Sequence, residues 1–305
     1  MGLFRNFDRI SPSVQARSML EMIMSLFLFT NAPATNYSLV VDGLKKIAAI
    51  NPLTAKWFEL GMSDSGQTIV GLKIGDGETA DLIVGTHHGN EYGATAVAMG
   101  AAESLAANPM PGHTVYVIPV LNISGYNTRN RYEQVGNRSI DPNRDYPGPC
   151  ATEGPFISKA TKALAEFIEK TNIVSSATLH TFSPAVLYPW GISTQDLATP
   201  YDSTFISLAK AATVESKYNY GNSTELLYAA DGAFEDYAFW KTGAWSLLFE
   251  LGHSHSPSQA DMKEMVAVNV PGLRRFIEMA PKERAANHAF TGRCDRSVMR
   301  RTHLE

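Results

Sequence analysis

Short apolar runs alternate with longer amphipathic or alanine-rich stretches along most of this chain, a pattern typical of α/β folds. The runs that predict strands are residues 57–59, 69–74, 82–84, 115–121, 175–179 and 245–251. The stretches that predict helices are residues 13–30, 37–51, 94–107, 159–170, 204–218 and 258–279. Because no repeat, low-complexity tract or linker interrupts this order, we expect one α/β domain.

The stretch 81–93 stands out because a buried strand, a polar turn and a helix follow one another directly. Gly85 stops the apolar run 82–84, and His88 and Glu91 follow it. In α/β sheets, ligands bind at the carboxyl ends of strands. On a helical turn, residues three apart project to the same side, and an imidazole with a carboxylate suits zinc. A zinc site needs at least one further protein ligand.

Two later strands also end at reactive side chains. His180 directly follows the run 175–179, and Glu250 lies inside the run 245–251. Burying an isolated carboxylate costs several kcal/mol, so Glu250 needs a partner or a catalytic task. If the histidines and Glu91 hold zinc, a nearby carboxylate is the expected general base.

A long polar connection, residues 122–147, carries four arginines. Connections of this length are usually functional in compact domains. Its guanidinium groups are suited to stabilising an oxyanion and to binding a substrate carboxylate.

Composition excludes some functions. The 305 residues are 44% hydrophobic and carry a net charge of −4, which argues against general affinity for nucleic acid or anionic membranes. No run of eighteen apolar residues occurs, so no transmembrane segment is expected. The two cysteines, Cys150 and Cys294, indicate no disulfide framework, although a single bridge stays open.

The N-terminal region allows two interpretations. Residues 22–29 are apolar and precede Ala-Pro-Ala at 32–34, which loosely resembles a signal-peptidase site. The run is short, however, and Glu21 lies at its edge. We expect residues 1–36 to form a helical extension of a cytoplasmic protein; an exported protein with residues 1–34 as its signal is the alternative.

Five segments, in order, resemble the motifs of zinc metallocarboxypeptidases of the carboxypeptidase A and B type. They are the HxxE of residues 88–91, Asp-Pro-Asn-Arg-Asp-Tyr at 141–146, Leu-His-Thr-Phe-Ser at 179–183, Leu-Leu-Tyr-Ala-Ala-Asp-Gly at 226–232 and Phe-Glu-Leu at 249–251. The resemblance runs from about residue 37 to residue 279. It implies a single domain with a mixed central sheet and helices on both faces. We therefore assign 37–281 to a catalytic domain and 282–305 to a basic tail that is solvated or packs on the body.

The resemblance implies a role for each matched residue. His88, Glu91 and His180 would bind one zinc ion, and Glu250 would activate the attacking water and pass its proton to the leaving amine. The substrate would be a peptide with a free C-terminal carboxylate. Its carboxylate would be held by Asn143 and Arg144 and covered by Tyr228.

The residue that polarises the scissile carbonyl stays open, because Arg129, Arg131 and Arg138 all lie upstream of the Asn-Arg motif. We favour Arg131, with Arg129 as the second candidate for substrate binding. The resemblance implies that the specificity position lies just before an acidic residue followed by an aromatic, here Asp236-Tyr237, and counting without gaps from Tyr228 then puts Glu235 at the base of the pocket for the departing side chain. A buried acid there favours a basic or amine-bearing terminal residue, whereas a surface-facing Glu235 would not.

Three further histidines and three other functions are alternatives to this interpretation. We expect His87 to be structural, and His253 and His255 to lie on a solvated turn rather than to bind a second metal. About forty residues precede the matched region, too few for a folded inhibitory prodomain, so cell-wall peptides compete with general peptide trimming as substrates. The rival functions are a zinc amidohydrolase that deacylates N-acyl amino acids and an inactive protein that binds peptide C-termini. A serine hydrolase is disfavoured, because no GxSxG motif occurs.

Overall fold

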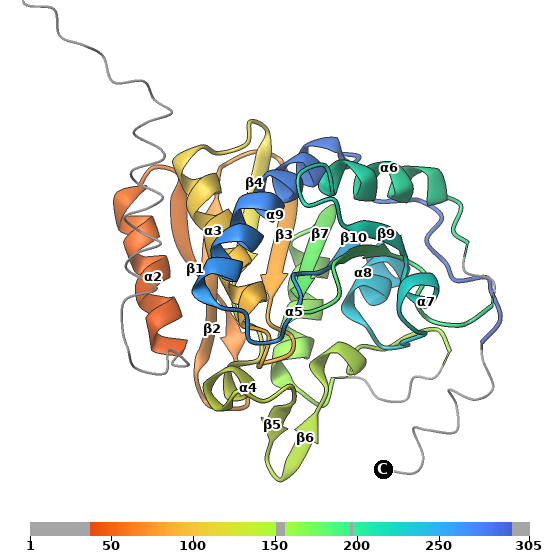
Figure 1. Cartoon of the computed structure of the whole chain (residues 1–305), viewed down its shortest axis with the longest axis horizontal. Coiled ribbons are helices and arrows are strands. Elements are labelled where there is room, and N and C mark those ends of the chain that lie inside the picture. The colour runs from red at the N-terminus through yellow and green to blue at the C-terminus, as the bar shows by residue number, and fades with distance from the viewer. Residues whose placement is uncertain (1–36, 151–155, 196–197, 295–305) are drawn as a thin grey trace, which may run out of the picture. The chain divides into compact units, whose positions relative to one another are not determined.

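The computed structural model describes residues 37–150, 156–195 and 198–294, and an eight-stranded sheet lies at the centre of this part of the chain (Figure 1). The strand order is β1-β2-β4-β3-β7-β10-β8-β9. The strands are β1 (Ala55–Met62), β2 (Thr68–Ile74), β3 (Thr79–Gly85), β4 (His113–Ile118), β7 (Ser175–His180), β8 (Ala185–Tyr188), β9 (Asn219–Asn222) and β10 (Trp245–Glu250). A separate hairpin pairs β5 (Glu133–Val135) with β6 (Arg138–Ile140).

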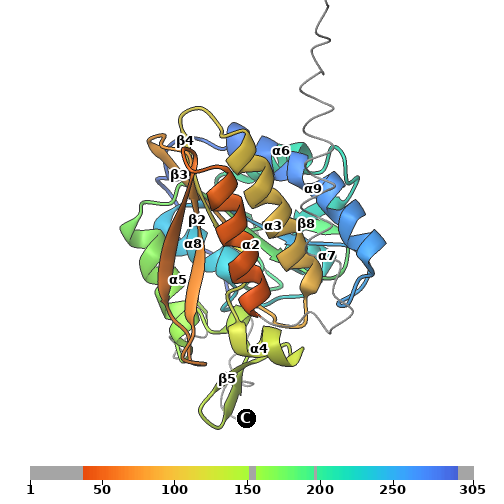
Figure 2. The same cartoon turned by 90° about the vertical axis from the view of Figure 1, so that its left-hand side faces the viewer.

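Helices cover both faces of the sheet, as predicted. The helices are α2 (Tyr37–Ile50), α3 (Tyr92–Ala107), α4 (Ile123–Thr128), α5 (Lys159–Lys170), α6 (Asp202–Ala212), α7 (Ser223–Leu226), α8 (Phe234–Thr242) and α9 (Gln259–Met279), with a 3-10 turn η1 (Pro142–Arg144). Figure 2 shows α2, α3 and α9 side by side on one face and α5 on the other. None of the helices among the described residues has both the length and the apolar character needed to cross a membrane.

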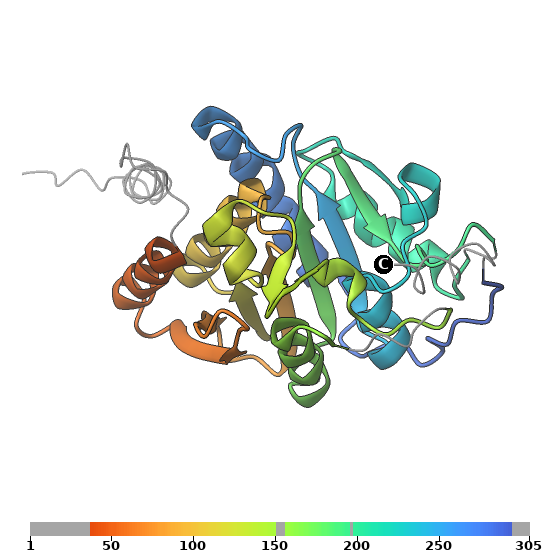
Figure 3. The same cartoon turned by 90° about the horizontal axis from the view of Figure 1, so that it is seen from below.

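The central strands place the reactive residues at one edge of the sheet. β4, β3, β7 and β10 run parallel, while β1, β2 and β8 pair antiparallel with their neighbours. Parallel strands that are covered on both faces are apolar throughout, and residues 82–84 are fully buried. Figure 3 shows β7 and β10 side by side. Their carboxyl ends therefore meet next to the loop that follows β3.

The predicted elements differ from the observed ones in several places. The strand and helix expected at 175–179 and 159–170 are confirmed, but the helix expected at 204–218 ends at Ala212. Strands β8 and β9 were missed: β9 reads Asn-Tyr-Gly-Asn and carries no apolar alternation, and the four apolar residues of β8 are too few for periodicity to identify a strand. The connection 122–147 contains α4, β5, β6 and η1 instead of an irregular loop. The helix predicted at 13–30, within the extension assigned to 1–36, lies outside the described residues.

The segment after α9 packs against the body up to Cys294. The Trp245 indole donates a hydrogen bond to the Glu283 carbonyl at 2.8 Å, and the Arg284 Nε donates to the Ile173 carbonyl at 2.9 Å. Cys294 forms a disulfide with Cys150. The single bridge that the sequence left open is therefore present, and it joins positions 144 residues apart.

Candidate metal centre and substrate pocket

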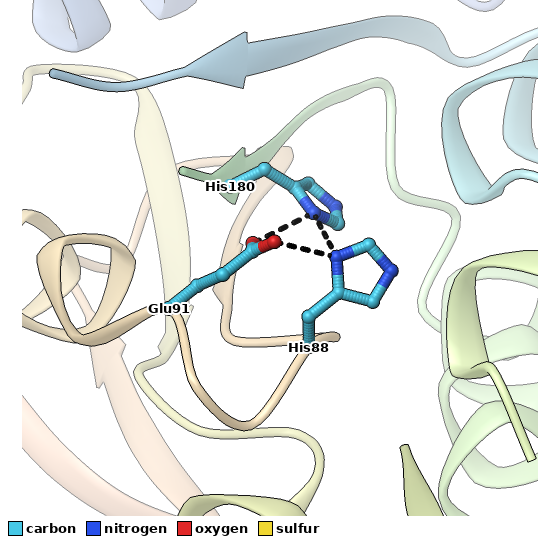
Figure 4. Close-up of side chains that lie close together, drawn as sticks. All are labelled: His88, Glu91 and His180. Atoms are coloured by element: carbon cyan, nitrogen blue, oxygen red, sulfur yellow. Dashed lines mark hydrogen bonds and ion pairs between the residues drawn. The ribbon is translucent and has the colours of Figure 1, made fainter. Parts of the chain in front are cut away.

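The three side chains that were predicted to bind metal converge at the carboxyl edge of the sheet (Figure 4). His88 Nδ1 lies 2.7 Å from Glu91 Oε1. His180 Nδ1 lies 3.1 Å from His88 Nδ1 and 3.1 Å from Glu91 Oε2. All three side chains are buried.

The turn between β3 and α3 brings His88 and Glu91 together in a different way from the helical turn that was expected. Glu91 occupies the N-cap position of α3, and its backbone N–H donates to the His88 carbonyl at 3.2 Å. The backbone passes close to α4 here, since a Cβ on Gly89 would lie 2.0 Å from the Gly125 carbonyl carbon. Only glycine fits between the two ligands at position 89.

Each imidazole is oriented through its second nitrogen. His88 Nε2 lies 3.1 Å from Asp141 Oδ1, and His180 Nε2 lies 3.3 Å from Thr178 Oγ1. Histidines that bind metal are usually oriented in this way by a carboxylate or another polar partner. Asp141 also accepts hydrogen bonds from Arg131 Nε at 3.0 Å and Arg131 Nη2 at 2.8 Å.

This donor set fits zinc. Two imidazole nitrogens and a carboxylate with a fourth position open to water form a common catalytic zinc site. Tetrahedral zinc with bonds of about 2.0–2.1 Å places its ligand atoms about 3.3 Å apart. The separations of 2.7–3.1 Å among the three side chains are close to that value.

The charges in the cluster stabilise one another. Burial raises the pKa of Glu91, but the neighbouring His88 and His180 outweigh this effect, so its pKa lies below the usual range. Burial lowers the pKa of His88, but Glu91 and Asp141 outweigh it and raise the pKa to about 9.

Glu250 lies beside the cluster, as predicted. It is the last residue of β10 and the direct neighbour of His180 across the parallel pairing, and it lines the same pocket as His88 and Glu91. Loss of hydration and repulsion from Glu91 raise its pKa to about 8. The carboxyl that was predicted to act as the general base therefore faces the candidate metal centre.

The three competing arginines lie in different places. Arg131 lines the pocket, with Nη1 at 3.2 Å from His88 Nδ1. Arg129 is the C-cap of α4, and its guanidinium lies over the Tyr92 ring at 5.6 Å from the centroid. Arg138 is exposed on β6. Of these three, only Arg131 is brought to the pocket.

The residues that were predicted to hold the substrate carboxylate meet at the pocket. Arg144 Nη2 donates a hydrogen bond to the Tyr228 hydroxyl at 3.3 Å. Asn143 Oδ1 accepts a hydrogen bond from the Phe234 N–H at 2.9 Å, which fixes the orientation of the amide. Asn143 is buried, whereas Tyr228 is 57% exposed and has room to move over a ligand.

Glu235 is buried in the pocket wall rather than facing the surface. Its Oε2 has no hydrogen-bond partner among the described residues. Burial raises its pKa to about 7. Leu187, Leu227 and Leu248 line the same pocket and pack against one another.

His87 is structural, as predicted. Its Nε2 lies 3.0 Å from the Tyr146 hydroxyl and its Nδ1 lies 3.1 Å from Thr178 Oγ1.

Two other residues of the site had no predicted role. Asp141 has a sequence signal, because it belongs to the segment that contains the Asn-Arg pair. His255 was expected on a solvated turn but lines the pocket, and its only signal is its position five residues after Glu250.

Comparison with known proteins agrees with this geometry. The chain is similar to carboxypeptidase B from Homo sapiens, with 30% identity over 169 residues, 45% of this chain and 40% of the relative. It is 26% identical to carboxypeptidase B from Astacus astacus over 246 residues, 67% of this chain and 80% of the relative. The match thus spans less than half of the Homo sapiens protein and most of the Astacus astacus protein.

Solved structures share the fold at low sequence identity. The structure of bovine thrombin-activatable fibrinolysis inhibitor in complex with tick carboxypeptidase inhibitor superposes with a TM-score of 0.73 at 16% identity, over 80% of this chain and 96% of that one. Carboxypeptidase A from Helicoverpa armigera gives 0.72 at 16% identity, over 87% and 80%. A family model described as zinc carboxypeptidase matches residues 40–271, well over half of the chain. This protein therefore belongs to the zinc carboxypeptidase family of metallopeptidases.

Proposed function

We propose that this protein is a zinc-dependent carboxypeptidase that releases the C-terminal residue of a peptide and prefers a terminal side chain that carries an amine. One observation supports the proposal most directly. A single pocket is lined by His88 and Glu91 of the candidate metal centre, by Glu250, by the Arg144–Tyr228 pair and by the buried Glu235. The groups needed for hydrolysis and for recognition of a free chain end therefore face one space.

The residues divide the reaction between them. His88, Glu91 and His180 would hold a zinc ion, which would supply Lewis-acid chemistry for the scissile carbonyl and the attacking water. Glu250 accepts a proton from that water and donates it to the leaving amine. Arg131, whose Nη1 points at the cluster, donates a hydrogen bond to the oxygen that becomes negatively charged.

Recognition of the chain end explains why a terminal residue is released. Arg144 binds the free carboxylate through its planar guanidinium, and the buried Asn143 amide adds a hydrogen bond. Tyr228 covers the same end from its exposed position above Arg144. A peptide that continues past the scissile bond has no terminal carboxylate for these groups.

The preference for an amine rests on Glu235. Leu187, Leu227 and Leu248 suit the alkyl stem of a long side chain, and the unpaired Oε2 of Glu235 suits an ammonium at its end. Lysine, ornithine and the diaminopimelate of cell-wall peptides all present such a group. Cell-wall peptides that end in diaminopimelate are therefore candidate substrates, together with peptides that end in lysine or ornithine.

The test combines metal content with product analysis. The purified protein should bind one zinc per chain and release the last residue from peptides varied only at that position, as followed by mass spectrometry. The Arg144→Ala variant should keep its zinc and lose at least about tenfold in kcat/KM on free-acid peptides, since a charge-assisted pair is worth roughly 1.5–3 kcal/mol. Unchanged kinetics in this variant, or release of acyl groups in place of C-terminal residues, would contradict the proposal.

A further inference from the structure

A loop after the catalytic strand brings one additional histidine to the pocket. Residues 251–258 join β10 to α9, and His255 lies at the pocket wall. Its Nδ1 is buried, lies 4.0 Å from Glu91 Oε1 and has no hydrogen-bond partner among the described residues. A separation of 4.0 Å is too long for a hydrogen bond, so this inward-facing nitrogen is available to a ligand.

The loop that carries His255 is held in place at both ends. The Leu251 N–H donates to the His180 carbonyl at 2.9 Å, and the Gly252 N–H donates to the Tyr218 hydroxyl at 3.1 Å. At the other end, Ser258 and Asp261 form a capping box at the start of α9. Because both ends are fixed, the position of the imidazole is fixed by the fold.

The ring is also fixed by an aromatic neighbour. His255 and Phe182 make an edge-to-face contact with centroids 4.8 Å apart and planes at 76°. Phe182 is 46% exposed and lines the same pocket. Together they form a half-exposed wall with one buried polar atom, which suits an extended peptide segment better than a free amino acid.

His255 and Phe182 reach the pocket from the loops that follow β10 and β7, whereas Glu235 reaches it from α8. A Cβ on Gly252 or on Gly93 would touch Met265, so the loop lies over the first turn of α3. Leu187 of β8 and Leu227, directly after α7, line the pocket together with Glu235 of α8. With the last side chain at Glu235, the free carboxylate at Arg144 and the scissile bond at the metal ligands, the wall that is left for the preceding residues contains Phe182 and His255.

We propose that His255 is a substrate-positioning residue, whose Nδ1 forms a hydrogen bond with the main chain of the residue before the scissile bond. This inference rests on the proposed carboxypeptidase function. A neutral imidazole can donate or accept at Nδ1, so the partner is a main-chain carbonyl oxygen or amide N–H of the peptide. The contact aligns the scissile bond with the metal centre and leaves the chemistry to Glu250.

Three variants test this role. His255→Phe keeps a ring against Phe182 and removes the nitrogen, and His255→Asn keeps a polar atom near the place of Nδ1. His253→Ala is the matched control, because His253 is exposed in the same loop. Each is compared with the wild type for zinc content, for thermal unfolding and for kcat and KM on two substrates. One is a tripeptide; the other is the N-formyl derivative of the same terminal amino acid, which has no residue before the scissile bond.

The expected result is a difference between the two substrates. With the tripeptide, His255→Phe should lower kcat/KM roughly three- to tenfold, mainly through KM, as expected for one lost hydrogen bond. With the N-formyl amino acid it should match the wild type. His255→Asn should recover part of the loss, and His253→Ala should behave as the wild type with both substrates.

Other results would overturn the inference. Equal losses on both substrates would mean that His255 only supports the loop, and so would a His255→Phe variant as active as the wild type on the tripeptide. If His255→Phe unfolds, His255→Ala takes its place in the same comparison, and wild-type kinetics of this variant on the tripeptide would reject the role. A zinc-loaded wild type that releases no terminal residue would reject the proposed function and this role together.

Discussion

Two carboxyl groups of the pocket, Glu250 and Glu235, have different neighbours and therefore different tasks. Glu250 neighbours His180, and the charge of Glu91 acts on it, whereas Glu235 is buried with one oxygen that has no hydrogen-bond partner among the described residues. Desolvation raises the pKa of Glu250 to about 8 and that of Glu235 to about 7. Binding of a divalent cation would favour the ionised form of Glu250, and an ammonium in the pocket would favour that of Glu235.

Replacing Glu250 should separate chemistry from metal binding. Glu250→Gln removes the proton acceptor without touching the three ligands, so kcat should fall by roughly 10²–10⁴ with little change in KM. Zinc content measured by plasma emission should equal that of the wild type. A variant that keeps its zinc and most of its kcat would exclude Glu250 as the general base.

The raised pKa of Glu235 predicts a pH-dependent preference. An acid whose pKa is raised to about 7 is neutral below that pH and charged above it. A lysine ammonium stays charged over this range, so the ratio of kcat/KM for terminal lysine over terminal leucine should rise between pH 6 and pH 8. In Glu235→Gln the ratio should be low and flat. A wild-type ratio that does not change with pH would assign the pocket another specificity.

The raised pKa of Glu235 also affects the stability of the protein, which should decrease with rising pH while the preference for lysine increases. Because burial penalises the charged form, its contribution to stability is complete below the unfolded-state pKa of about 4.5 and is lost as the pH rises through about 7. Glu235→Gln should therefore be more stable than the wild type at pH 8 and closer to it at pH 5. Urea unfolding at the two pH values measures this difference.

At the scale of elements, the segment between β5 and η1 supplies a large share of the site. The short hairpin leads into Asp141, which orients His88 and anchors Arg131, and η1 then presents Asn143 and Arg144. The sequence predicted that this connection is functional, because it is long, polar and rich in arginine. It could not predict the hairpin, since strands of three residues have no detectable periodicity.

The assignment of Arg131 over Arg129 also depends on the element that precedes them. Two arginines separated by one residue are chemically identical in the sequence. Arg129 adopts a left-handed conformation with φ 56° where α4 ends, and its side chain stacks on Tyr92. The chain then turns and directs Arg131 to Asp141. Which of the two arginines reaches the pocket depends on where the six-residue helix α4 ends, and sequence patterns locate helix ends poorly.

Asp141 should control the affinity for zinc without being a ligand. Asp141→Asn keeps the shape but removes the charge that holds both the His88 ring and the Arg131 guanidinium. Loss of such an outer partner typically weakens metal binding about 10–100-fold. Competition with a coloured chelator measures the change, and Asp261→Asn, on the surface at α9, is the control. Equal zinc affinity in the Asp141 variant and the wild type would show that His88 is positioned by its own backbone.

At the scale of the whole molecule, the sequence alone could not predict the order of the strands in the sheet or the disulfide that joins Cys150 to Cys294. The order of the motifs was sufficient to predict that His88, His180 and Glu250 lie close together, because the carboxyl ends of parallel strands share one edge of the sheet. Pairing of Cys150 with Cys294 depends instead on how the segment after α9 returns over the body, and no local pattern encodes that path.

The disulfide should make a large contribution to stability. It closes a loop of 144 residues, and the chain-entropy model assigns such a loop about 5 kcal/mol, of which natural bridges typically deliver roughly 2–5 kcal/mol. Cys294→Ser should therefore lower the free energy of unfolding by that amount in urea titrations under non-reducing conditions. Cys150→Ser should give a similar loss, and the double variant should add little, because either change removes the same bond.

Reductant provides the control for this prediction, because it should destabilise the wild type and leave the variants unchanged. The bridge lies six residues after Arg144 in the chain, so the variants also show whether carboxylate recognition depends on it. Since Arg144 and Tyr228 hold each other directly, we expect KM for free-acid peptides to stay within about twofold of the wild type in folded protein at 25 °C. Additive losses in the two single variants, or a wild type that is insensitive to reductant, would mean that the two cysteines act independently.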